Sequence, residues 1–112
     1  MSLNRREVRE AVLILSFEKL FRDDTENEII EIAKEIGDFK INDEVEHNFK
    51  GIYEKADELD EIISKFSDKR TIDRIPKINL AILRLALYEA KYDYKVPVNV
   101  AISEAVSLAG KY

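Results

Sequence analysis

The 112-residue chain contains no cysteine and no tryptophan, one histidine, three glycines and two prolines. The absence of cysteine excludes disulfide bonds, thiolate catalysis and cysteine-ligated zinc, and it is compatible with the cytoplasmic location that we expect. So few glycines and prolines favour long helices over many short strands. No run of about 18 apolar residues occurs, so no transmembrane helix is predicted, and the N-terminus lacks the pattern of a signal peptide.

The residues that are present have the balance of a soluble globular protein, with 46% hydrophobic and 37% charged side chains. This length suits one domain with its own hydrophobic core. We therefore expect a single domain over residues 1–112, of which residues 1–3 are in part foreign to the natural chain.

Hydrophobic residues recur at helical spacing in five segments. Residues 4–21 and 25–36 each begin with a capping box, Asn-x-x-Glu and Thr-x-x-Glu, and the second segment stops at a glycine. Residues 42–66 carry apolar side chains at alternating steps of four and three, and a last helix is expected to begin at residue 97. The helix over residues 76–92 is apolar almost all round. These patterns predict an all-α, single-domain bundle of about five helices with this helix buried at its centre.

Arg84 interrupts the apolar surface of that central helix. A buried guanidinium needs carboxylate or carbonyl partners, and Glu89 and Glu104 are the natural candidates. We favour a structural ion pair of Arg84 with Glu89 and Glu104, which would join this helix to the next, over an arginine that contacts RNA or a partner. Leu83 is adjacent, and its truncation to alanine is expected to cost about 2–5 kcal/mol.

The search for catalytic motifs is negative. The chain has no glycine-rich phosphate loop, no His-Glu-x-x-His pair and no Gly-x-Ser-x-Gly elbow. The single histidine, His47, neighbours Glu44 and Glu46 in an acidic helical turn. A metal site would need more nitrogen ligands, so a surface histidine is favoured. We predict no metal site, no cofactor, no catalytic residue and no enzymatic activity.

The charge of the chain is unevenly distributed. Residues 1–22 hold five basic groups against three acidic ones, a net charge of +2, while the other residues sum to −7. A basic end on an acidic body indicates a local anion site, although a charged helix start that only keeps the protein soluble gives the same pattern. Arg5 and Arg9 lie one helical turn apart and so share a face. The five tyrosines could stack on bases, but core or rim positions are favoured for most of them.

Two neighbouring segments resemble the NusB family. Residues 82–89, Ile-Leu-Arg-Leu-Ala-Leu-Tyr-Glu, are similar to the motif on the family's central helix, and residues 96–106 are similar to its Pro-x-x-x-x-Ile-Asn-Glu-Ala segment. Residues 5–9 resemble the family's arginine-rich first helix, and residues 72–77 its lead-in to the central helix. The resemblance spans essentially the whole chain. Its departures are Glu7 in place of a basic residue, Asn79-Leu80 in place of Asp-Arg, and Ser103 in place of Asn.

The resemblance implies an adaptor that binds boxA-like single-stranded RNA together with a small-subunit ribosomal protein, within a transcription antitermination complex and not at a membrane. By position, it makes Arg5, Arg6 and Arg9 the RNA-binding residues. One alternative is a protein–protein interaction module that has lost RNA binding, which Glu7 and the acidic remainder favour. The other is the N-terminal domain of an RNA methyltransferase, which requires a downstream glycine-rich α/β domain.

The resemblance also implies a final helix that follows the segment ending here at Tyr112. Residues 101–109 carry more apolar side chains than one packing face requires. Without that helix we expect part of this set to be exposed as a groove. A homodimer formed through the groove is the simplest self-association that would cover it.

Overall fold

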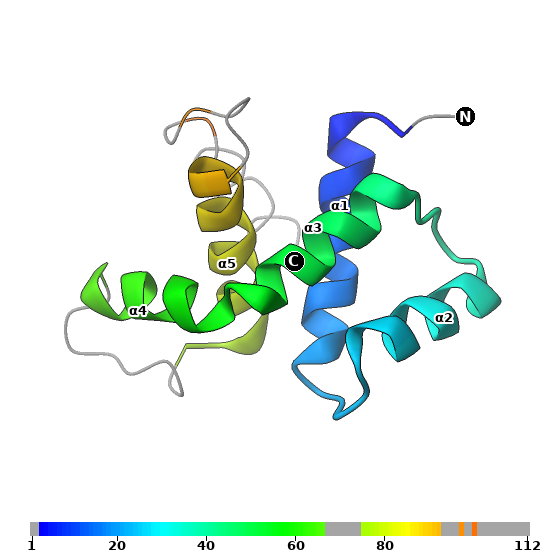
Figure 1. The fold of residues 1–112 in the computed structure, drawn as a ribbon, viewed down its shortest axis with the longest axis horizontal. Helices are drawn as coiled ribbons and strands as arrows, with labels where there is room; N and C mark the ends of the chain where they lie inside the picture. Colours follow the sequence, from blue (N-terminus) through cyan, green and yellow to red (C-terminus); the bar gives the residue numbers. More distant parts are fainter. Residues whose placement is uncertain (1–2, 67–74, 93–96, 98–99, 101–112) are drawn as a thin grey trace. The chain divides into compact units, whose positions relative to one another are not determined.

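The computed structural model describes residues 3–66, 75–92, 97 and 100. The chain divides into two compact units, Met1–Tyr53 and Glu54–Tyr112. All regular secondary structure in the described residues is helical (Figure 1), which confirms the predicted all-α class. The helices are α1 (Arg5–Lys19), α2 (Glu26–Ile36), α3 (Asp43–Glu54), α4 (Ala56–Phe66) and α5 (Lys77–Tyr92).

The first two helices begin and end as the sequence predicts. Asn4 caps α1 and Thr25 caps α2, each in a complete capping box that satisfies backbone N–H groups of the first turn. α2 ends at Gly37, whose φ of 73° lies in the left-handed region that a residue without a Cβ adopts at little cost. α1 ends two residues earlier than expected, at Lys19, and a tighter turn follows it.

The first unit places the apolar faces of α1, α2 and α3 in its interior. α1 contacts α2, which leaves its lower end obliquely (Figure 1). α3 is tied to α1 by the Tyr53 hydroxyl, which donates to the Ser16 carbonyl oxygen at 2.9 Å, and to α2 by a Lys34–Glu46 ion pair at 3.1 Å. The buried apolar residues of this unit are Val8, Ala11, Val12, Leu13, Leu15, Ile29, Ile30, Ala33, Val45, Phe49 and Ile52.

The single helix predicted over residues 42–66 is wrong in one respect. The structure has two helices there, α3 and α4, with Lys55 between them. The Leu59 N–H donates to the Lys55 carbonyl oxygen at 2.9 Å, which starts the hydrogen bonding of α4. The apolar spacing continues across Lys55 without a change of step, so the periodicity gave no sign of the interruption.

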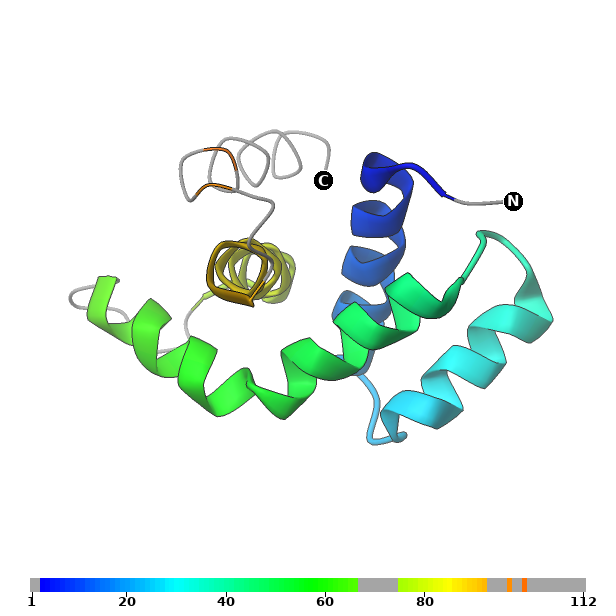
Figure 2. The same ribbon diagram turned by 45° about the horizontal axis from the view of Figure 1, so that its top comes forward.

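In the second unit, α5 packs on α4. The two helices are in contact, and α5 is seen almost end-on beside α4 in Figure 2. α5 is the helix that the sequence predicts to be buried, and the structure covers it on most sides. Its buried residues are Leu80, Ala81, Ile82, Arg84, Leu85, Ala86, Tyr88 and Glu89.

Leu83 is an exception within α5, because the burial from which its predicted stability cost was argued is not found. This side chain is 39% exposed, whereas its neighbours Ile82 and Leu85 are buried. A helix that is apolar all round can still leave one strip open, and sequence alone does not identify that strip. Truncating Leu83 therefore removes less buried area than we expected.

The helix predicted to begin at Pro97 lies outside the described residues, apart from Pro97 itself and Val100, and so does the predicted groove over residues 101–109. None of the helices in the described part of the chain is long and apolar enough to cross a membrane.

Candidate nucleic-acid interface

The N-terminal end of α1 presents two exposed arginines. Arg5 and Arg6 occupy the first turn, and the Arg6 side chain is 82% exposed. Cations in the first turn oppose the helix dipole, whose N-terminal end is positive, so the dipole does not favour their position there. Two exposed positive side chains at a helix end are suited to contact an anion such as phosphate.

Glu7, the acidic residue within this basic segment, has a structural role. Its backbone N–H donates to Asn4 Oδ1 at 2.8 Å, and its carboxylate accepts the Asn4 backbone N–H at 3.0 Å. Both bonds belong to the capping box that starts α1. Glu7 therefore holds the helix end that displays Arg5 and Arg6, and its presence does not by itself argue against an anion site.

Arg9 differs from the other two arginines. It is only 8% exposed and lies on the side of α1 that also buries Val12 and Ser16. Arg5 and Arg9 lie one turn apart on the same side of α1, but Arg5 is exposed and Arg9 is buried. The structure thus brings Arg5 and Arg6 to the surface together and separates Arg9 from them.

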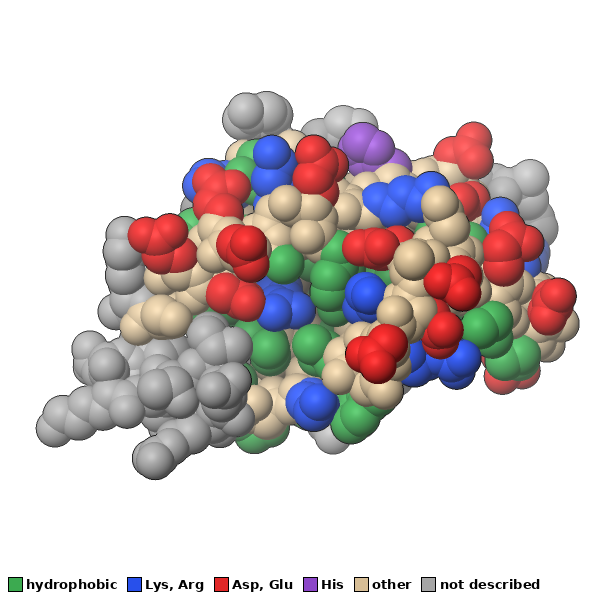
Figure 3. Space-filling model, turned by 60° about the horizontal axis from the view of Figure 1, so that its bottom comes forward, with side chains coloured by type: hydrophobic (Ala, Val, Ile, Leu, Met, Phe, Trp, Pro, Cys, Tyr) green, Lys and Arg blue, Asp and Glu red, His purple; other side chains and the backbone are tan. Residues whose placement is uncertain are grey.

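Surface charge elsewhere is mixed. On the face drawn in Figure 3, acidic side chains alternate with basic and hydrophobic ones instead of forming one area of a single sign. His47 is exposed on α3, as expected for a surface histidine. Among the described residues, no three histidine or carboxylate side chains gather where they could hold a metal ion.

Arg84 is buried, as predicted, and its described carboxylate partner is one that the sequence analysis did not name. Its Nε donates to Asp60 Oδ1 at 2.8 Å and its Nη2 donates to Asp60 Oδ2 at 2.7 Å. This two-pronged bond joins α5 to the preceding helix, α4. Glu89 is also buried on α5, while Glu104 lies outside the described residues, so the predicted pairing of Arg84 with those two stays a prediction.

The tyrosines that the structure describes have structural contacts. Tyr53 bonds to α1, Tyr88 is buried, and the Tyr92 hydroxyl donates to the Glu58 carboxylate, which also accepts Lys91. The bonds from Lys91 and then from Tyr92 hold the pKa of Glu58 below its ordinary value. These contacts agree with the core and rim positions favoured for most tyrosines; Tyr94 and Tyr112 lie outside the described residues.

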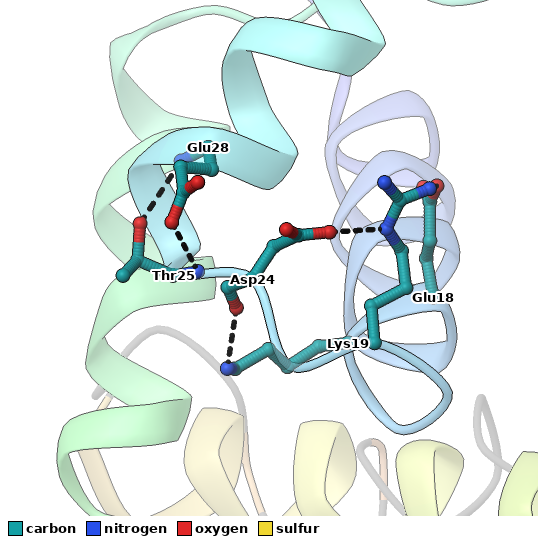
Figure 4. Close-up of polar contacts among 6 residues, drawn as sticks. Glu18, Lys19, Asp24, Thr25 and Glu28 are labelled. Atoms are coloured by element: carbon teal, nitrogen blue, oxygen red, sulfur yellow. Dashed lines mark hydrogen bonds and ion pairs between the residues drawn. The ribbon is translucent and has the colours of Figure 1, made fainter.

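The connection between α1 and α2 is held by several polar contacts (Figure 4). Lys19 Nζ donates to the Asp24 carbonyl oxygen at 2.7 Å, and Arg22 Nε donates to Asp24 Oδ2 at 2.6 Å. The bond with Asp24 raises the pKa of the Arg22 guanidinium above its already high ordinary value. This connection is therefore fixed at both ends, by α1 and by the capping box at Thr25 and Glu28.

The comparisons with known proteins agree with this architecture. The model of the NusB family matches residues 6–112. The chain belongs to the NusB family. It is 39% identical to the transcription antitermination protein NusB of Bacillus subtilis, and the match covers 98% of this chain and 82% of that protein. It is 35% identical to the NusB protein of Clostridium tetani, over 98% of this chain and 87% of that protein.

A solved structure extends the likeness to the fold. NusB of T. maritima superposes with a TM-score of 0.83 at 30% identity, covering 100% of this chain and 80% of that one. The NusB resemblance inferred from residues 82–89 and 96–106 is thereby confirmed, as is the NusB-like helical fold. Membership of a family of transcription antitermination factors also confirms the prediction that the chain is not an enzyme.

Proposed function

We propose that this NusB-family chain is an RNA-binding adaptor in transcription antitermination. It binds boxA-like single-stranded RNA through Arg5 and Arg6, together with a small-subunit ribosomal protein, and the pair joins a transcription complex in the cytoplasm. The observation that carries the proposal is the display of two arginines in the first turn of α1, where they oppose the helix dipole. Membership of the family supports the same reading.

Two arginines neutralise few phosphates, so the affinity of the chain alone for RNA is low and depends on salt. A protein partner that contacts the same RNA adds affinity because the second contact becomes intramolecular. The local arginines and the protein partner together explain how a chain with a net charge of −5 binds RNA.

The contribution of Arg9 is of a different kind. Because its side chain is largely buried, Arg9 supports the position of α1 and is less suited than Arg5 and Arg6 to contact RNA. A variant that removes all three arginines would therefore mix loss of RNA contacts with loss of packing. The test has to treat Arg9 separately.

The test is binding of a labelled boxA-like single-stranded RNA, measured by fluorescence anisotropy with and without the ribosomal protein. The double variant Arg5→Ala/Arg6→Ala is expected to weaken binding at least about tenfold while leaving helicity unchanged. Its matched control is Lys40→Ala/Lys50→Ala, which removes two exposed positive charges of the same unit outside α1. Equal affinity of the arginine variant and the parent would reject this site.

A protein–protein module without RNA binding is the second candidate, because residues 23–53 alone carry ten acidic against three basic side chains. Binding of the ribosomal protein without any binding of RNA at low salt would favour it. The methyltransferase alternative has less support, since the chain matches antitermination proteins over more than four fifths of their length.

A further inference from the structure

The exposed side of α1 continues from its arginine end into an apolar stripe. Positions 6, 10, 14 and 17 follow one another at steps of four, four and three, so they lie along one face of α1. Phe21 comes four positions after Phe17, in the turn that follows the helix. Arg6 and Glu10 pair on this face at 3.6 Å. The apolar stripe that follows consists of Ile14, Phe17 and Phe21.

Phe21 is the most exposed member of the stripe. Its side chain is 61% exposed, whereas Ile14 is 36% exposed and Phe17 is half-buried. The Phe21 ring meets the Phe17 ring edge to face, with 5.0 Å between centroids and 80° between planes. This geometry is the preferred one for two aromatic rings, and it fixes the direction of the Phe21 ring while leaving much of its surface open to solvent.

The backbone at Phe21 is also held in place. Its N–H donates to the Glu18 carbonyl oxygen at 3.1 Å, and the Arg22 N–H donates to the Lys19 carbonyl oxygen at 3.3 Å. The polar contacts of Figure 4 anchor the residues that follow. An exposed ring on a fixed backbone loses little conformational entropy when a ligand covers it.

The size and setting of the stripe favour a nucleic-acid base over a protein surface. Three partly exposed side chains offer on the order of 200–300 Å² of apolar area, well below the roughly 800 Å² that each partner contributes to a stable protein interface. That area is enough for one or two bases. The stripe also belongs to a segment, residues 1–22, with a net charge of +2, with Arg6 at one end and Arg22 next to Phe21.

We propose that Phe21 is a stacking platform for a base of the same RNA whose phosphates contact Arg5 and Arg6. The inference rests on the proposed RNA-binding function and extends its site along α1. At 1.5 Å per residue, α1 extends about 20 Å from Arg6 to its last residue, Lys19, and Phe21 lies in the turn that follows. A single strand of about six stacked nucleotides, or fewer when extended, spans that distance.

Three substitutions of Phe21 separate stacking from other contacts in the anisotropy assay with boxA-like RNA. Phe21→Ala removes the ring, and Phe21→Leu keeps an apolar side chain without a π-face. Both are expected to weaken RNA binding about 5- to 100-fold, the usual effect of removing one stacked aromatic. Phe21→Trp keeps a π-face and is expected to bind at least as tightly as the parent.

Phe21→Trp gives a second, direct measurement, because the parent chain has no tryptophan. RNA that stacks on the new indole should quench its fluorescence with the same concentration dependence as binding. Ile36→Trp is the matched control, since Ile36 is 62% exposed in the same unit but lies on α2, outside the stripe. Its fluorescence should stay unchanged on addition of RNA.

The outcomes separate the two proposals. If the parent binds RNA while Phe21→Ala and Phe21→Leu bind within twofold of it and Phe21→Trp is not quenched, stacking is rejected and the arginine site stands. If Phe21→Leu binds like the parent but Phe21→Ala is weak, the contact is apolar packing, as with a protein segment, and stacking is again rejected. If the parent binds no RNA at low salt, with or without the ribosomal protein, the proposed function fails and this inference with it.

Discussion

At the scale of single residues, Arg84 and Asp60 form a two-pronged ionic hydrogen bond in the second unit. Arg84 is buried on α5, and both of its bonds to the Asp60 carboxylate are short. Removing one partner of a buried pair leaves an uncompensated charge, and this is usually more costly than the pair is stabilising. The residue that interrupts the apolar helix is therefore tolerated because α4 supplies its counter-charge.

Asp60→Asn is expected to lower the free energy of unfolding by about 2–3 kcal/mol, somewhat less than for a fully buried pair, because Asp60 retains some contact with water. Chemical denaturation of the parent and the variant measures this. The comparison is Glu46→Gln, which breaks the more exposed Lys34–Glu46 pair and should cost about 1 kcal/mol or less. Equal losses in the two variants would show that burial of Arg84 does not matter.

Two leucines of α5, two positions apart, should respond very differently to truncation. Leu85 is buried, so Leu85→Ala is expected to cost about 2–5 kcal/mol through lost apolar burial and the cavity it leaves. Leu83 is 39% exposed, and Leu83→Ala should cost about 1 kcal/mol or less. Thermal or urea unfolding of the Leu85→Ala and Leu83→Ala variants measures the two losses of stability. A loss at Leu83 as large as that at Leu85 would mean that another element covers Leu83.

At the scale of helices, Glu58 connects α4 to α5 by accepting from both Lys91 and Tyr92. Lys55 adds to this cluster, with its Nζ 5.6 Å from the centroid of the Tyr92 ring. The cluster lies near the end of α5, where positive side chains such as Lys91 are also favoured by the helix dipole. Its contribution to stability should depend on the charge of Glu58.

The two helices should therefore separate more easily in acid. Because the pKa of Glu58 is lowered in the folded state, its stabilising effect is present above its ordinary pKa of 4.5 and is lost as the pH falls through the lower, folded-state pKa. The melting temperatures of the parent and Glu58→Gln should differ at about pH 7 and converge by about pH 3.

The control for this experiment is Glu35→Gln, which neutralises an exposed carboxylate of α2. It removes the same charge from the chain without touching the α4–α5 cluster. If the melting difference between the parent and Glu58→Gln is the same at both pH values, the bonds to Lys91 and Tyr92 do not stabilise the folded state through the charge of Glu58.

At the scale of the whole molecule, binding of RNA has to overcome a net charge of −5. Long-range electrostatics therefore do not attract RNA to the chain as a whole, and the local display of Arg5 and Arg6 has to supply the phosphate contacts. A small number of phosphate contacts gives an affinity that depends only weakly on salt. The slope of the logarithm of the binding constant against the logarithm of salt concentration therefore gives the number of these contacts.

For single-stranded RNA, the logarithm of the binding constant should fall with the logarithm of salt concentration with a slope of about −1.4, or about −0.7 for each of two phosphates. Arg5→Ala/Arg6→Ala should bring the slope close to zero, and Lys40→Ala/Lys50→Ala should leave it unchanged. Anisotropy titrations at several salt concentrations measure the slopes. A steep slope that survives the arginine substitutions would place the phosphate contacts elsewhere.

The expected homodimer belongs to the same scale and stays a prediction, because residues 101–109, which should form its groove, lie outside the described residues. Sedimentation over a range of concentrations tests it. A chain that stays monomeric at high concentration would contradict it.

The sequence by itself determined the features that depend on near neighbours in the chain. The capping boxes at Asn4 and Thr25 and the stop at Gly37 use bonds and backbone angles within four residues, so local pattern was sufficient to place them. The all-α class and the burial of α5 followed from apolar spacing, and the family from motifs in residues 82–106. The break at Lys55 was the exception, because it left that spacing intact.

Only the tertiary structure decided which side of each helix is covered and which distant charges meet. Arg9 is buried while Arg6 is exposed, although both belong to the same basic segment, because helices that pack on α1 cover one of its sides. Arg84 meets Asp60, which is 24 positions away in the sequence. Such pairs depend on how helices cross, and no spacing within a single helix encodes that crossing.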